Sequence, residues 1–319
     1  MTFLIPTHTQ AHEGLRAIKT ALTAAGPLDD LRRAAVAAVQ RHLLRTDHDF
    51  DALGTITPAE LARAIDDPAL RAQLVGGMAT LVLAREPVDP REIAVVESFA
   101  EALGVHPSAL DQLRRLHDER MIMLRIDAAR RGLAGPAIAQ LYEDEGFLGV
   151  LKNVASVTGI RENRPLAERY HALESFADGT LGKELWRFYK RHGYAFPGEK
   201  HGAPESLLTH DLSHVLGGYE TDFASEGLVL GFQAGYRKQD PFAVLVFLLL
   251  QGQQGVKLTI FAEAHHGFFN DKPELVEGIV RAFARGARMK VDLTDRWDFW
   301  AVMDRPVEEL RERYGIAAA

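Results

Sequence analysis

Proline placement is the feature of this sequence that most restricts what the chain can fold into. A proline has a fixed φ and no N–H, and both properties suit the first position of a helix rather than its interior. Nine of the fourteen prolines stand where a helix would begin, at Pro58, Pro68, Pro90, Pro107, Pro136, Pro165, Pro241, Pro273 and Pro306. Several follow a residue that can cap a helix, namely Thr57, Asp67, Asp89 and Asp240. With almost no strand-like alternation elsewhere, this pattern predicts an all-α protein.

Apolar spacing between these starts indicates how the helices are divided. Apolar residues recur at helical spacing in residues 31–38 and 93–103. A long polar helix is expected over residues 109–131, and it runs into RRGLAGPA, whose glycines and proline predict a break. A chain of 319 residues also suits two hydrophobic cores better than one. We therefore predict two helical domains, a small bundle at residues 1–131 and a larger domain at residues 132–319.

Composition excludes several classes of function. The chain has no cysteine, which excludes disulfides, cysteine-ligated zinc and a thiol nucleophile. Histidine and carboxylate side chains are then the expected metal ligands. The formal net charge is -7. Because the Lys and Arg residues are dispersed among acids, no nucleic acid partner is expected.

The most apolar run, FAVLVFLLL at residues 242–250, bears on location. It is too short to cross a bilayer, for which about 20 apolar residues are needed. Residues 1–10 have neither a basic start nor a long apolar core, so no signal peptide is expected. We expect a soluble cytoplasmic protein in which this run is a buried core helix. Together with Phe261, Phe268 and Phe269, the run could also wall a pocket for a prenyl chain.

The stretch HDLSHVLGGYETDFASE at residues 210–226 carries the candidate site. His210 and His214 are four apart, so on a helix they share one face with Cβ atoms roughly 5 to 6 Å apart. Asp211 stands where the zinc-hydrolase pattern H-E-x-x-H has its acid. The glycine pair after them ends that helix, and a reversal there would bring Glu226, early in the next helix, back to the histidines.

Spacing alone leaves two interpretations of this stretch open. It predicts a metal site made of two histidines and one or two carboxylates. The same residues also fit a structural role, in which the histidines are hydrogen-bonded and Glu226 complements a helix dipole.

The spacing His210-Asp211-x-x-His214, then eleven residues, then Glu226 resembles the HDxxH-x11-E signature of the ubiquinone (coenzyme Q) biosynthesis protein 4 family. FADGTLGKELWRFYKRHG at residues 176–193 and WDFWAVMDRPVEELRERYGI at residues 297–316 are similar to its flanking segments, the second of them its closing helix. The likeness covers roughly residues 140–316. It implies an all-α domain whose divalent metal, expected to be zinc, is held by these four residues, with Asp211 as the catalytic residue.

That resemblance also implies a function and partners. Its members act in ubiquinone biosynthesis, in oxidative removal of the ring C1 carboxylate from a polyprenylated benzoate and in organising the other enzymes. The expected partners are a prenylated aromatic lipid or quinone precursor and other quinone-biosynthesis enzymes, at the inner face of the membrane. Trp297 and Trp300, three apart on the expected closing helix, fit a core anchor or the interface of a homodimer.

The N-terminal half resembles a different family. VDPREIAVVESFAEALGV, within a likeness over residues 15–118, is similar to tellurite-resistance TerB-like helical domains in its helix starts and apolar spacing. Those domains often carry an acidic Asp-Gly where this chain has Arg85, Glu86 and Pro87, which leaves this half without an expected metal site. Domains with the HDxxH-x11-E motif usually stand alone, so the added half fits a docking module and the pathway could differ.

Two other classes of function remain open from the sequence. One is a non-catalytic scaffold or lipid carrier in which a metal only pins helices together. The other is a metal-dependent hydrolase with Asp211 as general base. A hydrolase of the HD type would need further ligands, for which the available residues are His171, His192, His201 and Asp240. His265 and His266 are adjacent, so on a helix they would face different ways and not join one site, with Glu263 nearby.

Overall fold

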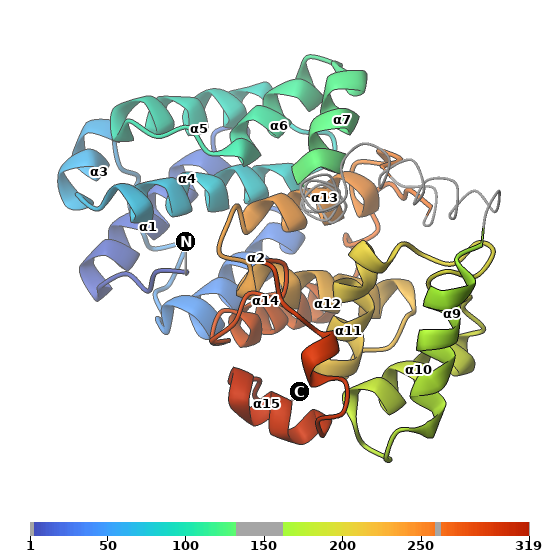
Figure 1. Ribbon diagram of the computed structural model, residues 1–319. Coiled ribbons are helices and arrows are strands. Elements are labelled where there is room, and N and C mark those ends of the chain that lie inside the picture. Colours follow the sequence, from blue (N-terminus) through green and yellow to red (C-terminus); the bar gives the residue numbers. More distant parts are fainter. Residues whose placement is uncertain (1–2, 132–161, 259–262, 319) are drawn as a thin grey trace.

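The computed structural model describes residues 3–131, 162–258 and 263–318 (Figure 1). In these ranges the regular elements are all helices, and β pairing is limited to two isolated bridges, Thr180 with Pro306 and Gln254 with His266. The predicted all-α class is confirmed. No helix in the described ranges is both long enough and apolar enough to cross a membrane.

The helices of the first half are α1 (His8–Leu22), α2 (Asp30–Val39), the π-helical turn η1 (Gln40–Leu44), α3 (Pro58–Ala64), α4 (Pro68–Leu83), α5 (Pro90–Leu103), α6 (Ser108–His117) and α7 (Met121–Arg131). Those of the second half are α9 (Arg164–His171), η2 (Ala172–Ser175), α10 (Leu181–His192), η3 (Glu205–Leu207), α11 (Leu208–Gly217), α12 (Phe223–Tyr236), α13 (Phe242–Gly252), α14 (Pro273–Gly286), η4 (Trp300–Val302) and α15 (Val307–Tyr314).

The prolines begin helices as predicted. Four of them are the first residue of α3, α4, α5 and α14, one is the second residue of α9, and three directly precede α6, α13 and α15. Pro136 lies outside the described residues. The side chains of Thr57, Asp67 and Asp89 accept backbone N–H groups of the first turns that follow them, which confirms these three caps.

Asp240 does not cap a helix, so that prediction is wrong. The helix after it, α13, has Pro241 at its start and no capping side chain. The Asp240 carboxylate instead accepts from Ser108 Oγ at 2.7 Å and from Arg131 Nη1 at 3.4 Å. Because these partners come from α6 and α7, Asp240 ties the start of α13 to the first half of the chain.

The long polar helix expected over residues 109–131 is also wrong, because it is broken into α6 and α7. The chain turns between them, with Glu119 in the left-handed region at φ 54°. The turn folds α7 back on α6, so that Gln112 Nε2 donates to Asp127 Oδ2 at 2.8 Å and Leu113 and Leu124 enter one core. No glycine or proline marks the turn, so the sequence pattern did not show it.

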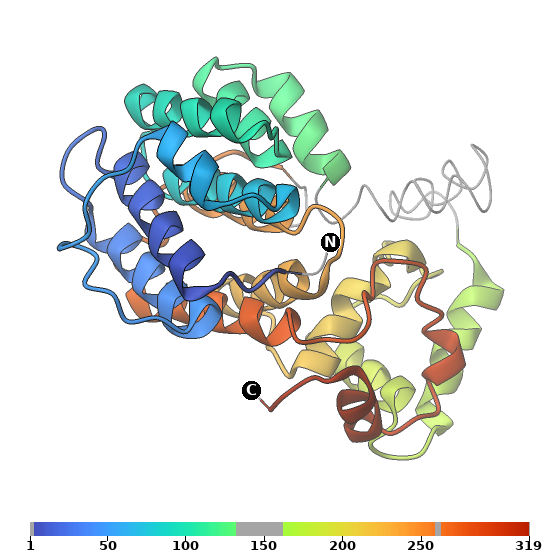
Figure 2. The same ribbon diagram turned by 90° about the vertical axis from the view of Figure 1, so that its left-hand side faces the viewer.

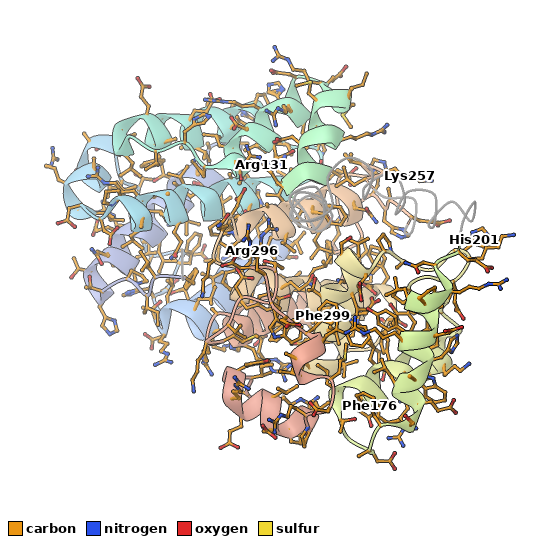
Figure 3. All side chains as sticks on the ribbon, in the orientation of Figure 1. Arg131, Phe176, His201, Lys257, Arg296 and Phe299 are labelled. Carbon is orange, nitrogen blue, oxygen red and sulfur yellow. The ribbon has the colours of Figure 1, made fainter. Side chains whose placement is uncertain are left out.

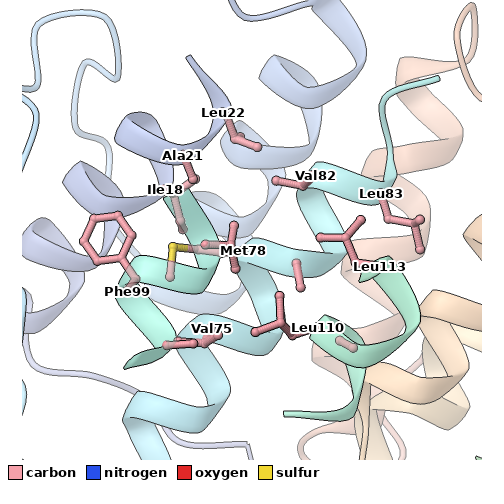
Figure 4. Packing of buried hydrophobic residues seen from close by; sticks show 14 of the residues in the cluster. Ile18, Ala21, Leu22, Val75, Met78, Val82, Leu83, Phe99, Leu110 and Leu113 are labelled. Carbon is pink, nitrogen blue, oxygen red and sulfur yellow. The ribbon is translucent and has the colours of Figure 1, made fainter. Parts of the chain in front are cut away.

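The core of the first half is completed by the second half. Met78, Val82, Phe99 and Leu110 pack together from α4, α5 and α6 (Figure 4). Val246, Leu250 and Val256 belong to the same cluster, because α13 packs against α4, α6 and α7 (Figures 1 and 2). The FAVLVFLLL run therefore forms a core helix, as expected. The domain boundary after residue 131 stays a prediction, since residues 132–161 are outside the described ranges.

Close packing on α14 fixes the position of α12, the helix that carries Glu226. A Cβ built on Gly235 would lie 2.1 Å from the Phe283 carbonyl oxygen, and one on Gly286 would lie 2.1 Å from the Phe232 carbonyl oxygen. A side chain at either position would overlap the opposite backbone, so only glycine allows this approach. Aromatic and aliphatic side chains of α9, α10, α11 and α15 form a further core against α12.

The closing helix expected over residues 297–316 is shorter than predicted. Regular helix covers α15 only, and Trp297 lies in the irregular segment before η4, so the two tryptophans do not share a helix face. Trp297 Nε1 donates to Tyr314 Oη at 3.1 Å, and Trp300 Nε1 donates to Glu205 Oε1 at 2.7 Å. Their indoles therefore act as anchors that join this segment to its neighbours.

Candidate metal centre

The local sequence folds into a helix, a glycine stop and a second helix, as predicted. His210, Asp211 and His214 lie on α11, which ends at Gly217. Gly218 adopts the left-handed conformation at φ 71°, and its N–H donates to the His214 carbonyl at 2.7 Å. Asp222 then caps α12 by accepting from the N–H groups of residues 224 and 225, which places Glu226 in the first turn.

This turn brings three side chains to one point. His210 Nε2 lies 3.2 Å from Glu226 Oε2, and His214 Nε2 lies 3.4 Å from Glu226 Oε1. The two Nε2 atoms are 3.2 Å apart. Within the described ranges, His210, His214 and Glu226 form the group of side chains that could hold a metal ion. The predicted pairing of the two histidines with Glu226 is thus reproduced in the geometry.

Hydrogen bonds at the far nitrogens fix how the histidines face the centre. His214 Nδ1 lies 3.3 Å from the Tyr219 carbonyl oxygen, which can only accept, so this nitrogen carries the proton. His210 Nδ1 lies 3.3 Å from Gln233 Oε1, and the Gln233 amide nitrogen donates to Ser213 Oγ at 3.4 Å. In their neutral forms both histidines therefore turn the Nε2 lone pair toward Glu226. Metal-binding histidines are typically oriented in this way.

Three acceptors that meet at one point need positive charge between them. Burial opposes ionisation of Glu226, but hydrogen bonds from His210 and His214, and their charges, lower its pKa to about 2. Burial also works against a charged His210, yet the hydrogen bond to Glu226 and its negative charge leave the His210 pKa raised. A proton on His210 or a bound cation satisfies the carboxylate.

The separations are small enough for a single ion to contact all three side chains. A tetrahedral ion with ligands about 2.0 to 2.2 Å away holds neighbouring ligand atoms about 3.3 to 3.6 Å apart, whereas an octahedral ion holds them about 2.8 to 3.1 Å apart. The observed distances of 3.2, 3.2 and 3.4 Å span the interval between these two ranges, so one divalent ion can meet all three atoms. An ion held by two imidazoles and one carboxylate would have room for a further ligand.

Asp211, the fourth predicted ligand, lies beside this group and is not part of it. Its carboxylate accepts a hydrogen bond from the Tyr189 hydroxyl of α10. Burial raises the pKa of Asp211 even though His210 and Tyr189 act against the rise. Burial and the Asp211 charge likewise hold the pKa of Tyr189 well above its ordinary value. Direct ligation and catalysis by Asp211 stay predictions.

A second hydrogen-bonded pair, the buried Tyr170 and the carboxylate of Glu205, lies on the same side as Tyr189. Tyr170 Oη donates to Glu205 Oε1 at 2.6 Å, and burial, together with the Glu205 charge, raises the pKa of Tyr170. Phe196 stacks between the two tyrosines, with ring centroids 5.0 Å from Tyr189 and 6.4 Å from Tyr170. The side of the centre formed by α9 and α10 is therefore aromatic, with acidic groups that are already hydrogen-bonded.

The extra ligands required by a hydrolase of the HD type are not brought to the site. His171 Nε2 pairs with Glu199 at 2.8 Å, and His192 Nδ1 bonds Thr221 Oγ1 at 3.1 Å. His201 is exposed at the edge of the molecule (Figure 3), and Asp240 bonds Ser108 as described. The described geometry therefore gives no support to that arrangement.

The adjacent histidines also lie elsewhere, and the expectation that they occupy a helix is wrong. His265 packs its ring on Phe223, with centroids 4.6 Å apart, and His266 hydrogen-bonds Glu86 of the first half. Both belong to the irregular segment before α14, as does Glu263. Phe261 falls outside the described residues.

Sequence reasoning missed the residues that orient the histidines. Gln233 follows Glu226 by seven residues, or two helical turns, so its place on the same face of α12 was open to prediction. Tyr219 acts through its backbone carbonyl. Every residue has such a group, so the residue type at this position gives no signal. Tyr189 comes from α10, and its contact with Asp211 depends on how two helices pack.

Comparison with models of known protein families finds no family that matches this chain, and comparison with curated proteins finds no match. The two family resemblances therefore rest on the motifs and spacings quoted above and stay predictions.

Proposed function

We propose that this chain is a zinc protein of prenylquinone biosynthesis, with the ion held by His210, His214 and Glu226. The observation that supports this most is the convergence of two imidazole lone pairs and a carboxylate at separations of 3.2 to 3.4 Å. A donor set of two nitrogens and one carboxylate oxygen suits zinc, while magnesium and calcium prefer oxygen ligands alone. The HDxxH-x11-E resemblance supports the pathway.

The charge of this donor set favours an anionic substrate. Two neutral histidines and one carboxylate leave a bound divalent ion with a net positive charge. When bound, the ion would polarise a substrate oxygen and stabilise the negative charge that develops as carbon dioxide leaves. A benzoate carboxylate or its ring phenolate therefore suits the centre. The proposed reaction is removal of the ring C1 carboxylate from a prenylated benzoate. The C–C bond to the carboxylate breaks, carbon dioxide leaves, and the ring carbon takes a proton; in the oxidative form of the reaction an external oxidant would instead supply a ring oxygen.

Asp211 and Tyr189 have a proton-handling role in this proposal. The Tyr189 hydroxyl donates to Asp211, whose pKa is raised chiefly by burial, so the pair can hold a proton beside His210. Such a pair serves general acid–base work when a substrate group comes within reach. Phe196, which is buried, stacks on Tyr189 on this side of the centre.

Metal analysis tests the site directly. Protein purified without chelator should contain one zinc ion per chain, and a His210→Ala, His214→Ala double variant should fold but lose it. His171→Ala is the matched control, because His171 also pairs with a glutamate but lies outside the centre. Absence of a stoichiometric ion from the folded wild-type chain would exclude the proposal.

A non-catalytic role is the second candidate, and the source of the ligands favours it. They come from α11 and α12, so an ion would pin the two helices together whether or not a reaction follows. Tyr189→Phe removes the proton path and leaves the metal ligands intact. Loss of prenylbenzoate decarboxylation with unchanged zinc content supports catalysis, whereas unchanged quinone production supports a carrier or scaffold.

A further inference from the structure

A second site lies between the first half of the chain and the pair α13 and α14. A partly open cavity of about 200 Å³ is lined there by side chains of α1, α2, α4, α13 and α14, with Phe3 and Pro6 along one side. Figure 2 shows the N-terminal segment running between these helices. The cavity shares no residue with the group formed by His210, His214 and Glu226.

The cavity wall is apolar, and its polar side chains are already hydrogen-bonded. Gln73 accepts the Leu4 N–H at 2.7 Å through Oε1 and donates to the Leu4 carbonyl at 2.8 Å through Nε2. Thr80 Oγ1 donates to the Gly76 carbonyl at 2.8 Å, and Gln10 Oε1 accepts the Thr7 N–H at 3.0 Å. A buried water needs two to four polar partners, so water is poorly suited to this space.

The same wall limits what kind of molecule can enter. Apart from the amide nitrogen of the half-exposed Gln10, it offers no free polar side-chain atom to a ring hydroxyl, a carbonyl or a headgroup, so deep insertion of any of these would leave a buried polar group unpaired. A smaller apolar cavity of about 150 Å³ already binds benzene or xenon. We propose that this cavity binds one hydrocarbon chain of a lipid, with the polar end of the lipid left at the surface.

The N-terminal segment lies between the cavity and solvent. Phe3, Pro6 and Gln10 line the cavity and are each half-exposed, and Ile5 between them is 65 % exposed. The Phe3 ring meets the Phe283 ring edge to face at 5.3 Å. The lipid headgroup therefore belongs at this end of the cavity.

The hydrocarbon site and the metal centre are separated by one wall. Ile279 of α14 lines the cavity and also packs on α12, where a Cβ built on Gly227 would lie 3.3 Å from Ile279 Cδ1. Gly227 directly follows Glu226. The inference does not depend on the proposed metal function, because its residues come mainly from the first half and the two sites can be emptied separately.

Two substitutions would fill the cavity from different helices. Gly77 lines it from α4, and a Cβ there would meet Phe242 only at 3.9 Å, so Gly77→Leu has room for its side chain. Ala35→Phe adds a ring from α2. Ala37→Leu is the matched control, because Ala37 lies on α2 but is exposed.

Binding is measured on the purified full chain with farnesol and 1-dodecanol, which represent isoprenoid and straight-chain lipids, by native mass spectrometry and by thermal shift. The wild-type chain and Ala37→Leu should bind one molecule and melt at a higher temperature. Gly77→Leu and Ala35→Phe should bind at least tenfold more weakly, with the same metal content as the wild-type chain. Binding of farnesol alone would identify an isoprenoid ligand, and equal binding would identify a general hydrocarbon site.

Two results would overturn the inference. One is that neither alcohol binds the wild-type chain, and the other is that both bind a folded cavity-filling variant as they bind wild type. If both variants fail to fold, a diazirine-bearing alkanol crosslinked to the wild-type chain locates the site. Labelling of peptides from α4 or α13 supports the cavity, while labelling confined to other helices contradicts it.

Discussion

At the scale of single residues, the candidate site depends on atoms that orient ligands as much as on the ligands. Gln233 Oε1 holds the Nδ1–H of His210 at 3.3 Å, and the Tyr219 carbonyl does the same for His214. The convergence of His210, His214 and Glu226 was predictable, because four-residue spacing and a glycine stop determine which faces meet. Their orientation was not, since it depends on a backbone carbonyl and on an amide held by Ser213.

Replacing Gln233 should weaken zinc binding without removing a ligand. Gln233→Leu takes away the acceptor for His210 Nδ1, so the imidazole can rotate or change tautomer, and the loss in affinity should be about 10- to 100-fold. Competition with a chromophoric chelator measures it. Gln233→Glu keeps an acceptor and should retain affinity. Gln251→Leu, at another buried glutamine, is the control, and equal affinities in all three variants would contradict the assigned role.

The pH dependence of stability should reverse when zinc is added. In the metal-free chain the His210 pKa is raised above 6.5, so its contribution is complete below that pH and is lost as pH rises through the raised value. The Glu226 pKa is lowered from 4.5 to about 2, so its contribution is complete above pH 4.5 and is lost toward pH 2. Zinc needs a deprotonated histidine, so its stabilising effect grows as pH rises.

Melting temperatures of wild type and Glu226→Gln, compared from about pH 5 to pH 9, test this reversal. With chelator present, the advantage of wild type should shrink as the pH rises above 6.5, the ordinary histidine pKa. With zinc present it should grow over the same interval. A wild-type advantage that does not change with pH in either condition would show that the His210 and Glu226 pair does not titrate as described.

At the scale of elements, helix starts were readable from the sequence and turns without glycine or proline were not. Capping side chains act on the turn that directly follows them, so Thr57, Asp67 and Asp89 could be identified locally. The break between α6 and α7 is made by Glu119 in a left-handed conformation, which few non-glycine residues adopt. Tertiary packing of α7 on α6, through Gln112 and Asp127, selects that turn.

The contact between α12 and α14 should tolerate no side chain at Gly235. A Cβ there would stand 2.1 Å from the Phe283 carbonyl oxygen, so Gly235→Ala must push the helices apart. Overpacking of this kind costs about 1 to 3 kcal/mol or more. Chemical denaturation should show that loss, together with weaker zinc binding because α12 carries Glu226. At Gly54 the nearest atom to a built Cβ is 4.0 Å away, so Gly54→Ala should change neither quantity.

At the scale of the whole molecule, the two halves share a hydrophobic core. Helical class was predictable because it follows from local spacing, but the place of α13 was not. An apolar run such as FAVLVFLLL is suited to any core and does not indicate which one it enters. Gly76 of α4 accepts the Phe242 ring, since a Cβ there would lie 2.7 Å from Phe242 Cδ2.

A fragment of residues 1–131 should therefore not fold as the same residues do in the full chain. Without Val246, Leu250 and Val256 it exposes the faces of α4 and α6 that these side chains cover. Strong binding of a hydrophobic dye and a broad thermal transition are expected, with a sharp transition for the full chain as reference. A fragment that unfolds as sharply as the full chain would contradict the shared core.

The shared core also delays folding of the first half while the chain is being synthesised. Domains usually fold from the N-terminus as the chain emerges from the ribosome. Here the helices from α1 to α7 are made first, but Val256, which completes their core, follows Arg131 by more than a hundred residues. At a synthesis rate of about 5 to 20 residues per second, the apolar face of α4 and α6 stays uncovered for several seconds or longer before α13 has been made. Transiently exposed apolar surface of this kind is prone to aggregation until its covering residues arrive.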